Sequence, residues 1–141
     1  MGLKKDDSYA KTLQFAKKNN VQVIFTGKLS KQEWIELSKD YNVFIITTHF
    51  DNTPVSIIEA IALCLPVVST NVGGIPYLLE QNVNALLVED DDVDGMTNQI
   101  KLLLTEPNLA LNFFKKKEKN WLNAMIGKLS KRNGLNCWFN G

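Results

Sequence analysis

Residues Phe44–Pro76 read FIITTHFDNTPVSIIEAIALCLPVVSTNVGGIP, and this stretch decides the fold. It contains most of the apolar run Val43–Ile46, whose lack of polar alternation is typical of a strand covered on both faces of a parallel sheet. A polar loop follows, and a helix begins at Pro54, where a missing N–H costs nothing. A second buried strand, Pro66–Ser69, leads to a turn at Gly73-Gly74. The stretch therefore predicts a parallel strand–helix–strand unit.

The same alternation of helices and strands extends on both sides of this stretch. We expect helices over Ser8–Asn19, from a cap at Ser30 to about Tyr41, over Pro54–Leu63, Ile75–Glu80 and Asp92–Thr105, and strands over Val21–Phe25, Val43–Ile46, Pro66–Ser69 and Ala85–Val88. Right-handed crossovers turn this order into an open, parallel, Rossmann-like α/β sheet with helices on both faces.

The length of 141 residues suits one globular domain with a core. We expect a partial Rossmann-like domain over residues 1–110, because the chain begins on a helix with no strand before it. Residues 111–141 read as a C-terminal tail that is helical or weakly ordered. Its basic cluster, Lys115–Lys117 with Lys119, is more typical of a solvated helix face than of a phosphate site.

The composition excludes several classes of function. A net charge of +1 gives no reason to expect nucleic acid or an anionic membrane as a partner. No apolar run approaches the ~18 residues of a membrane span, and the chain does not open on an apolar signal segment. Cys64 and Cys137 form no CxxC pair and His49 is the single histidine, so we expect neither a disulfide framework nor a zinc site. The simplest setting is the cytoplasm.

The start of the helix at Pro54 is a candidate anion site, because ligands of an open parallel sheet bind at the carboxyl ends of its strands. Free N–H groups near Val55 and Ser56, together with the helix dipole, favour a phosphate there. The Ser56 hydroxyl adds a donor. The alternative is that Thr53 or Asn52 simply caps the helix with no ligand present.

Two carboxylates, Asp51 and Glu59, flank this helix start with seven residues between them. Glu59 lies in an apolar run and is i+3 from Ser56, and helical side chains lean toward the N-terminus, so its carboxylate points to the anion end. Asp51 can accept hydrogen bonds from sugar hydroxyls. The alternatives are an exposed glutamate and a plain Asx turn. His49 alone is more typical of an incidental loop residue.

The role of a glycine pair stays open in the sequence, whereas a calcium site in an acidic segment is excluded. Gly73-Gly74 lets the backbone approach a ligand closely, or it is only a tight turn. Asp90, Asp92 and Asp94 match the start of a calcium loop, but the twelfth position holds Lys101 instead of glutamate. We expect these acids to open the following helix, near its positive end.

In this order and spacing, the features resemble the C-terminal, donor-binding half of retaining glycosyltransferases of the GT-B type, namely glycosyltransferase family 4, group 1. The resemblance runs from about Gly2 to about Pro107 and is strongest over Phe44–Pro76. It implies transfer of a hexose from a nucleotide diphosphate sugar to a hydroxyl acceptor with retention, in the synthesis of cell-surface polysaccharide. No metal or other cofactor is expected, because the helix dipole and basic residues stabilise the leaving diphosphate.

The resemblance also implies roles for single residues. Glu59 holds the ribose hydroxyls and Asp51 holds hydroxyls of the transferred sugar. The turn Thr53–Ser56 lies along the diphosphate, and Gly27 and Lys28 border the nucleotide base. We assign no catalytic residue.

The chain departs from the family pattern at several positions. Asp51 replaces the usual glutamate, Cys64 stands where the pattern A-x-G-x-P has glycine, and Tyr77 stands where an acid is common. We expect the N-terminal acceptor domain to be missing, and any peripheral membrane contact to come through that absent domain. These 141 residues alone are then not expected to catalyse transfer. Two alternatives stay open: a non-catalytic nucleotide-binding module, and a remnant or interaction protein.

Overall fold

The computed structural model describes residues 7–52 and 54–115. Contacts divide the chain into two compact units, Met1–Lys31 and Gln32–Gly141, each of which is described by itself. The tail that we separated at residue 110 lies mostly outside the described residues, so that division stays a prediction. Among the described residues, no helix is both long and apolar enough to cross a membrane.

The first unit contains the helix α1 (Asp7–Lys18), as predicted, and an extended segment after it. Asn20 has a left-handed backbone with φ of 53°, which turns the chain out of the helix. The ring of Tyr9 packs against that of Phe25, with centroids 4.4 Å apart. The predicted strand Val21–Phe25 is wrong: the residues are extended but form no ladder. β-branched residues favour an extended backbone, but a strand also needs a neighbouring strand to which it can hydrogen-bond.

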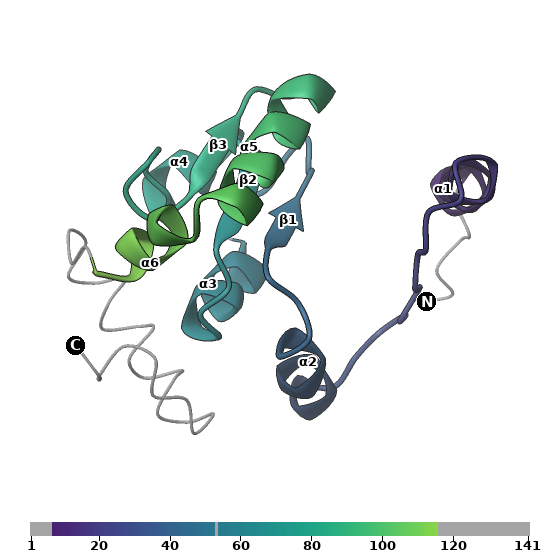
Figure 1. The fold of residues 1–141 in the computed structure, drawn as a ribbon, viewed down its shortest axis with the longest axis horizontal. Coiled ribbons are helices and arrows are strands. Elements are labelled where there is room, and N and C mark those ends of the chain that lie inside the picture. Colours follow the sequence, from purple (N-terminus) through teal and green to yellow (C-terminus); the bar gives the residue numbers. More distant parts are fainter. Residues whose placement is uncertain (1–6, 53, 116–141) are drawn as a thin grey trace. The chain divides into compact units, whose positions relative to one another are not determined.

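The second unit is built on a parallel sheet in the order β1-β2-β3 (Figure 1). Its strands are β1 (Phe44–Ile46), β2 (Val67–Thr70) and β3 (Leu86–Val88). Phe44 pairs with Val67, and Val68 pairs with Leu86. These three strands confirm the expected parallel sheet. It is the α/β architecture that the alternation of helices and strands predicted.

Five helices accompany the strands in the described part of the chain, and four of them were predicted. They are α2 (Lys31–Ser38), α3 (Val55–Ala62), α4 (Ile75–Leu78), α5 (Val93–Thr105) and α6 (Pro107–Lys115). The unexpected helix, α6, begins with proline at its first position, where the ring suits the helical φ. It crosses residue 110, the boundary that we placed between domain and tail.

Helices cover both faces of the sheet, as predicted (Figure 1). Successive β2 residues point to opposite faces, so Val67 packs in a core with α3 and α4, while Val68 packs in a second core with α5 and α6. All four β2 residues are buried. β1 does not follow the expectation of burial on both faces, because its middle residue, Ile45, is 43% exposed. β1 is an edge of the described sheet, so fewer elements can cover it.

α3 ends in a Schellman motif that contains no glycine. The N–H of Cys64 donates to the Ile61 carbonyl over 3.0 Å, and the N–H of Leu65 donates to the Ala60 carbonyl over 3.0 Å. Cys64 occupies the left-handed position of the motif with φ of 60°. Its Cβ is therefore strained where the motif usually has glycine. Cys64 is also disulfide-bonded, which corrects the expectation that the cysteines form no disulfide; Cys137 lies outside the described residues.

We predict that Cys64→Gly raises the free energy of unfolding by about 1 kcal/mol relative to Cys64→Ala. Both variants lack the sulfur, and only alanine keeps the Cβ in the left-handed conformation. The measurement is urea unfolding of the two variants, with tryptophan fluorescence as the signal. Equal midpoints would show that the left-handed position at the end of α3 carries no strain.

Candidate functional site

The carboxyl ends of the three strands place three loops at one edge of the sheet. These loops are residues 47–54 before α3, residues 71–74 before α4 and residues 89–92 before α5. In an open parallel sheet this edge is where ligands bind. All the predicted site residues of the second unit come from the first two loops and from α3.

The first turn of α3 has no cap from a described side chain. Pro54 is the N-cap residue and is buried, and it makes no side-chain cap hydrogen bond. The Ile57 N–H donates to the Pro54 carbonyl over 3.1 Å, which leaves the N–H groups of Val55 and Ser56 without an acceptor inside the helix. Capping by Asn52 is therefore not observed, and Thr53 lies outside the described residues. The helix start is available to an anion.

The two predicted carboxylates lie on either side of this helix start. Asp51 is half-buried in the loop, and Glu59 is half-buried on the second turn of α3. Val55 and Ser56 are exposed, while Ile57 and its neighbours on the inner face are buried, so Glu59 shares the outer stripe with Val55 and Ser56. Glu59 therefore lies on the same exposed side of α3 as the two residues at its start, one turn further along the helix. Its role there stays a prediction.

The Gly73-Gly74 turn makes a close approach to the loop before α3. The Gly74 N–H donates to the Asp51 carbonyl over 2.7 Å. A Cβ on Gly74 would overlap the Asn52 carbonyl, with its carbon 2.7 Å away, and a Cβ on Gly73 would lie 3.1 Å from the Asp51 carbonyl carbon. Gly73 also has a left-handed φ of 55°. The turn therefore lies tightly against the backbone of the neighbouring loop, and its close approach to a ligand stays a prediction.

A buried threonine holds the same loop at a second point. Thr70, at the end of β2, is only 4% exposed, and its Oγ1 donates to the Thr48 carbonyl over 2.6 Å. Sequence reasoning missed Thr70, because a threonine at the end of an apolar strand also suits β propensity alone. The signal in the sequence was a hydroxyl directly after a strand that we expected to be buried, because a buried hydroxyl needs a hydrogen-bond partner within the protein.

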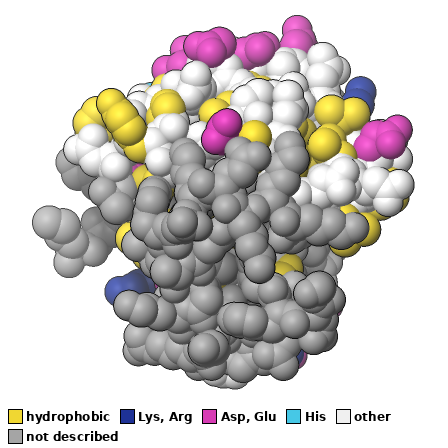
Figure 2. Space-filling view, turned by 90° about the vertical axis from the view of Figure 1, so that its left-hand side faces the viewer, with side chains coloured by type: hydrophobic (Ala, Val, Ile, Leu, Met, Phe, Trp, Pro, Cys, Tyr) yellow, Lys and Arg dark blue, Asp and Glu magenta, His cyan; other side chains and the backbone are white. Residues whose placement is uncertain are grey.

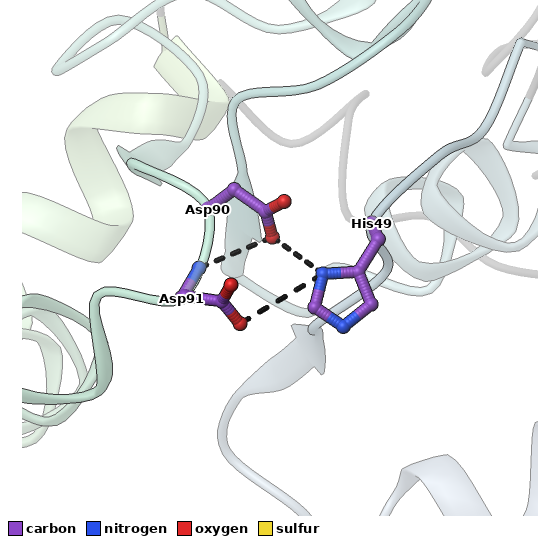
Figure 3. A group of neighbouring side chains, drawn as sticks. All are labelled: His49, Asp90 and Asp91. Carbon is purple, nitrogen blue, oxygen red and sulfur yellow. Dashed lines mark hydrogen bonds and ion pairs between the residues drawn. The ribbon is translucent and has the colours of Figure 1, made fainter.

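A third contact joins the loop before α3 to the loop before α5. The His49 Nδ1 lies 2.7 Å from one Asp90 oxygen and 3.9 Å from one Asp91 oxygen (Figure 3). The hydrogen bond to Asp90, then the charges of Asp90 and Asp91, raise the pKa of His49 above its ordinary 6.5.

We had interpreted His49 as incidental and Asp90 as one of the acids that open α5. The residue that caps α5 is Asp92, whose side chain accepts from the Gly95 N–H over 2.8 Å.

A pocket of about 300 Å³ lies beside this pair. Its lining includes His49, Thr70 and four consecutive acids, Glu89 to Asp92. Figure 2 shows acidic side chains gathered along the upper edge of the face that it draws. The atoms of His49, Asp90 and Asp91 that could bind a metal lie within 4.8 Å of one another. All three side chains are exposed, and the hydrogen bond between His49 and Asp90 already explains why they lie close together.

The remaining predicted residues, Gly27 and Lys28, belong to the first unit. Gly27 has a left-handed φ of 65°, and Lys28 is exposed. Their place beside a nucleotide base stays a prediction.

We predict that Gly74→Ala destabilises the chain by about 1–3 kcal/mol, because the new methyl overlaps backbone that cannot move independently. The amide resonances of Asp51 and Asn52 should shift in a ¹⁵N–¹H NMR spectrum. Gly27→Ala is the control, since in the described chain nothing lies within 4 Å of its Cβ. That variant strains its own φ and should leave both amides unchanged. Unshifted Asp51 and Asn52 amides in Gly74→Ala would contradict the close approach.

We also predict that Asp90→Asn lowers the pKa of His49, because the hydrogen bond and the nearer charge are both weakened. The single histidine of the chain gives one unambiguous titration by NMR. Because the folded-state pKa is raised, the pair contributes stability below pH 6.5 and loses it as the pH rises through the folded-state value. An unchanged pKa in Asp90→Asn would contradict the hydrogen bond.

Comparisons with known proteins point to one family. The profile of the family "Glycosyl transferases group 1" matches residues 1–135. An uncharacterized glycosyltransferase of Haemophilus influenzae is 30% identical over 71 residues, which is 50% of this chain and 20% of that protein. The poly(ribitol-phosphate) alpha-N-acetylglucosaminyltransferase of Staphylococcus aureus is 28% identical over 103 residues, 72% of this chain and 20% of that protein. The chain thus spans a fifth of the length of these relatives.

The fold is also similar to solved structures. Anabaena HepE in complex with UDP superposes with a TM-score of 0.70 at 20% identity, covering 94% of this chain and 37% of HepE. The same protein with UDP-glucose gives a TM-score of 0.69 at 18% identity, with the same coverage. At this identity the likeness shows the fold alone. The predicted fold class, an open parallel α/β sheet of the GT-B type, is confirmed.

Proposed function

The chain belongs to the family Glycosyl transferases group 1, and from that premise we propose that it is the donor-binding part of a hexosyltransferase. Its substrate is a nucleotide diphosphate sugar, from which a hexose passes to a hydroxyl acceptor with retention of anomeric configuration, as in glycosyltransferase family 4. The product belongs to cell-surface polysaccharide. The proposed setting of the reaction is the cytoplasm.

One observation carries this proposal: the uncapped start of α3 opens between Asp51 and the outer stripe that bears Glu59. Unpaired N–H groups at a helix start favour a diphosphate, and carboxylates favour the hydroxyls of the sugars joined to it. HepE, a protein with the same fold, was solved with UDP and with UDP-glucose, which supports a donor of this chemistry.

Each residue then has a distinct role in the proposed site. The diphosphate lies along Thr53–Ser56, where Val55 and Ser56 supply backbone N–H groups and Ser56 adds its hydroxyl. Glu59 accepts hydrogen bonds from the ribose, and Asp51 accepts them from the transferred sugar. Gly27 and Lys28 border the base. Gly73 and Gly74 hold the loop in place.

The helix start also suits the chemistry of transfer. When the bond between the anomeric carbon and the diphosphate breaks, negative charge develops on the leaving oxygen. Oriented N–H groups at the end of a helix stabilise that charge without reorganising. We propose that they do so without a metal ion, and we assign no residue as base or nucleophile.

In this proposal the chain is one part of a larger enzyme. The chain spans about a fifth of the curated relatives that it matches. We propose that acceptor binding, and any peripheral contact with a membrane, require a further domain, and that these residues alone bind donor without transferring the sugar.

The test is isothermal titration of the full chain with UDP, GDP and ADP, repeated on Glu59→Ala. One nucleotide should bind, and Glu59→Ala should weaken it at least about tenfold, the loss typical of a hydrogen bond to a charged group. Glu36→Ala, which removes an exposed carboxylate from α2, is the matched control and should bind as the wild type does.

The outcomes separate the alternatives. A nucleotide that binds equally well to Glu59→Ala would contradict the ribose role and favour a non-catalytic nucleotide-binding module. A folded chain that binds none of the three nucleotides would contradict the donor site and favour a remnant or interaction protein.

A further inference from the structure

The loop that carries Asp51 is held to the rest of the second unit by three contacts. Thr70 binds the Thr48 carbonyl over 2.6 Å, Gly74 binds the Asp51 carbonyl over 2.7 Å, and Asp90 binds the His49 imidazole at 2.7 Å. The first two partners come from the end of β2 and the turn after it. The third comes from the far loop, after β3, and is 41 residues away in sequence. The loop is therefore fixed from two sides.

These three contacts differ in their response to pH. Those from Thr70 and Gly74 involve a hydroxyl and an amide, which do not titrate near neutrality. The contact from Asp90 involves an imidazole, which gains or loses its charge in that range. When the imidazole is protonated, the contact is an ion pair with a short hydrogen bond, and when it is neutral only the hydrogen bond can remain.

The charged groups that share the pocket with His49 are acidic. Asp90 and Asp91 lie nearest, and Glu89 and Asp92 line the same pocket. None of the described residues that line this pocket is a lysine or arginine. The charges of Asp90 and Asp91 favour the protonated imidazole, and no cationic side chain among the described residues of the pocket competes with it for these carboxylates.

We propose that Asp90 is a positioning residue for the donor site: by binding the protonated imidazole of His49, it holds the loop that carries Asp51, so that nucleotide binds more tightly when His49 is charged. This inference rests on the proposed function, because it regulates the same site. Asp90 itself does not touch the donor. The effect is modest, about two- to five-fold in affinity, because both side chains are exposed.

The experiment uses reciprocity between two binding events. If protonation of His49 favours nucleotide binding, then nucleotide must raise the pKa of His49 by the same factor. We would titrate the single histidine of the full chain by NMR, with and without saturating UDP, in wild type, Asp90→Asn and Asp94→Asn. Asp94→Asn is the matched control, because it removes a charge from the same acidic segment (Glu89–Asp94).

The expected result is a rise in the pKa of His49 on binding UDP in wild type and Asp94→Asn, and a smaller rise or none in Asp90→Asn. An equal rise in all three proteins would show that the anionic nucleotide acts on His49 directly, and would overturn the role of Asp90. No rise in wild type at saturating UDP would also overturn it.

A second measurement tests the loop without any nucleotide. The amide chemical shifts of Asp51 and Gly74 should change with pH, with a midpoint at the pKa of His49, in wild type. In Asp90→Asn these shifts should no longer follow the protonation of His49. If they do not titrate in wild type, the contact does not position the loop. This result is independent of nucleotide binding, so it separates failure of this inference from failure of the proposed function.

Discussion

One short contact between two loops determines the geometry of the candidate site: the hydrogen bond from the Gly74 N–H to the Asp51 carbonyl, 2.7 Å long. It can form only because neither Gly73 nor Gly74 has a side chain, since a Cβ on either one would meet the backbone of the neighbouring loop. The same contact brings the turn before α4 against the loop before α3. Backbone polar groups of the two loops therefore lie together at this edge of the sheet. Larger residues at positions 73 and 74 would push the two loops apart.

The parallel sheet explains why these loops meet. In a parallel sheet all strands end at the same edge, so the loops after β1, β2 and β3 lie there together, although they are far apart in sequence. Two apolar cores, one on each face, fix the strands that hold the loops. Fully buried β2 is the centre of this arrangement, and Thr70 at its end connects the buried core to the Thr48 carbonyl.

Sequence reasoning identified what depends on local pattern. It found α3 from Pro54, the buried strand β2 and the turn at Gly73-Gly74, because proline, apolar runs and glycine each restrict the backbone directly. It wrongly expected a strand at Val21–Phe25, because pairing depends on a partner that propensity does not specify. It also missed the contact between His49 and Asp90, since a pair 41 residues apart leaves no periodic signal. The elements that carry the proposed site residues were thus predictable, whereas the contacts that hold their loops together were not.

The most direct test of the proposed donor site is to map the amides that respond when UDP is added to the ¹⁵N-labelled chain. A donor site at the start of α3 predicts that the perturbed amides cluster at Val55, Ser56, Gly73 and Gly74, at the carboxyl edge of the sheet, with little change at the opposite edge. Perturbations centred on residues outside the loops before α3 and α4, with these four amides unmoved, would contradict it.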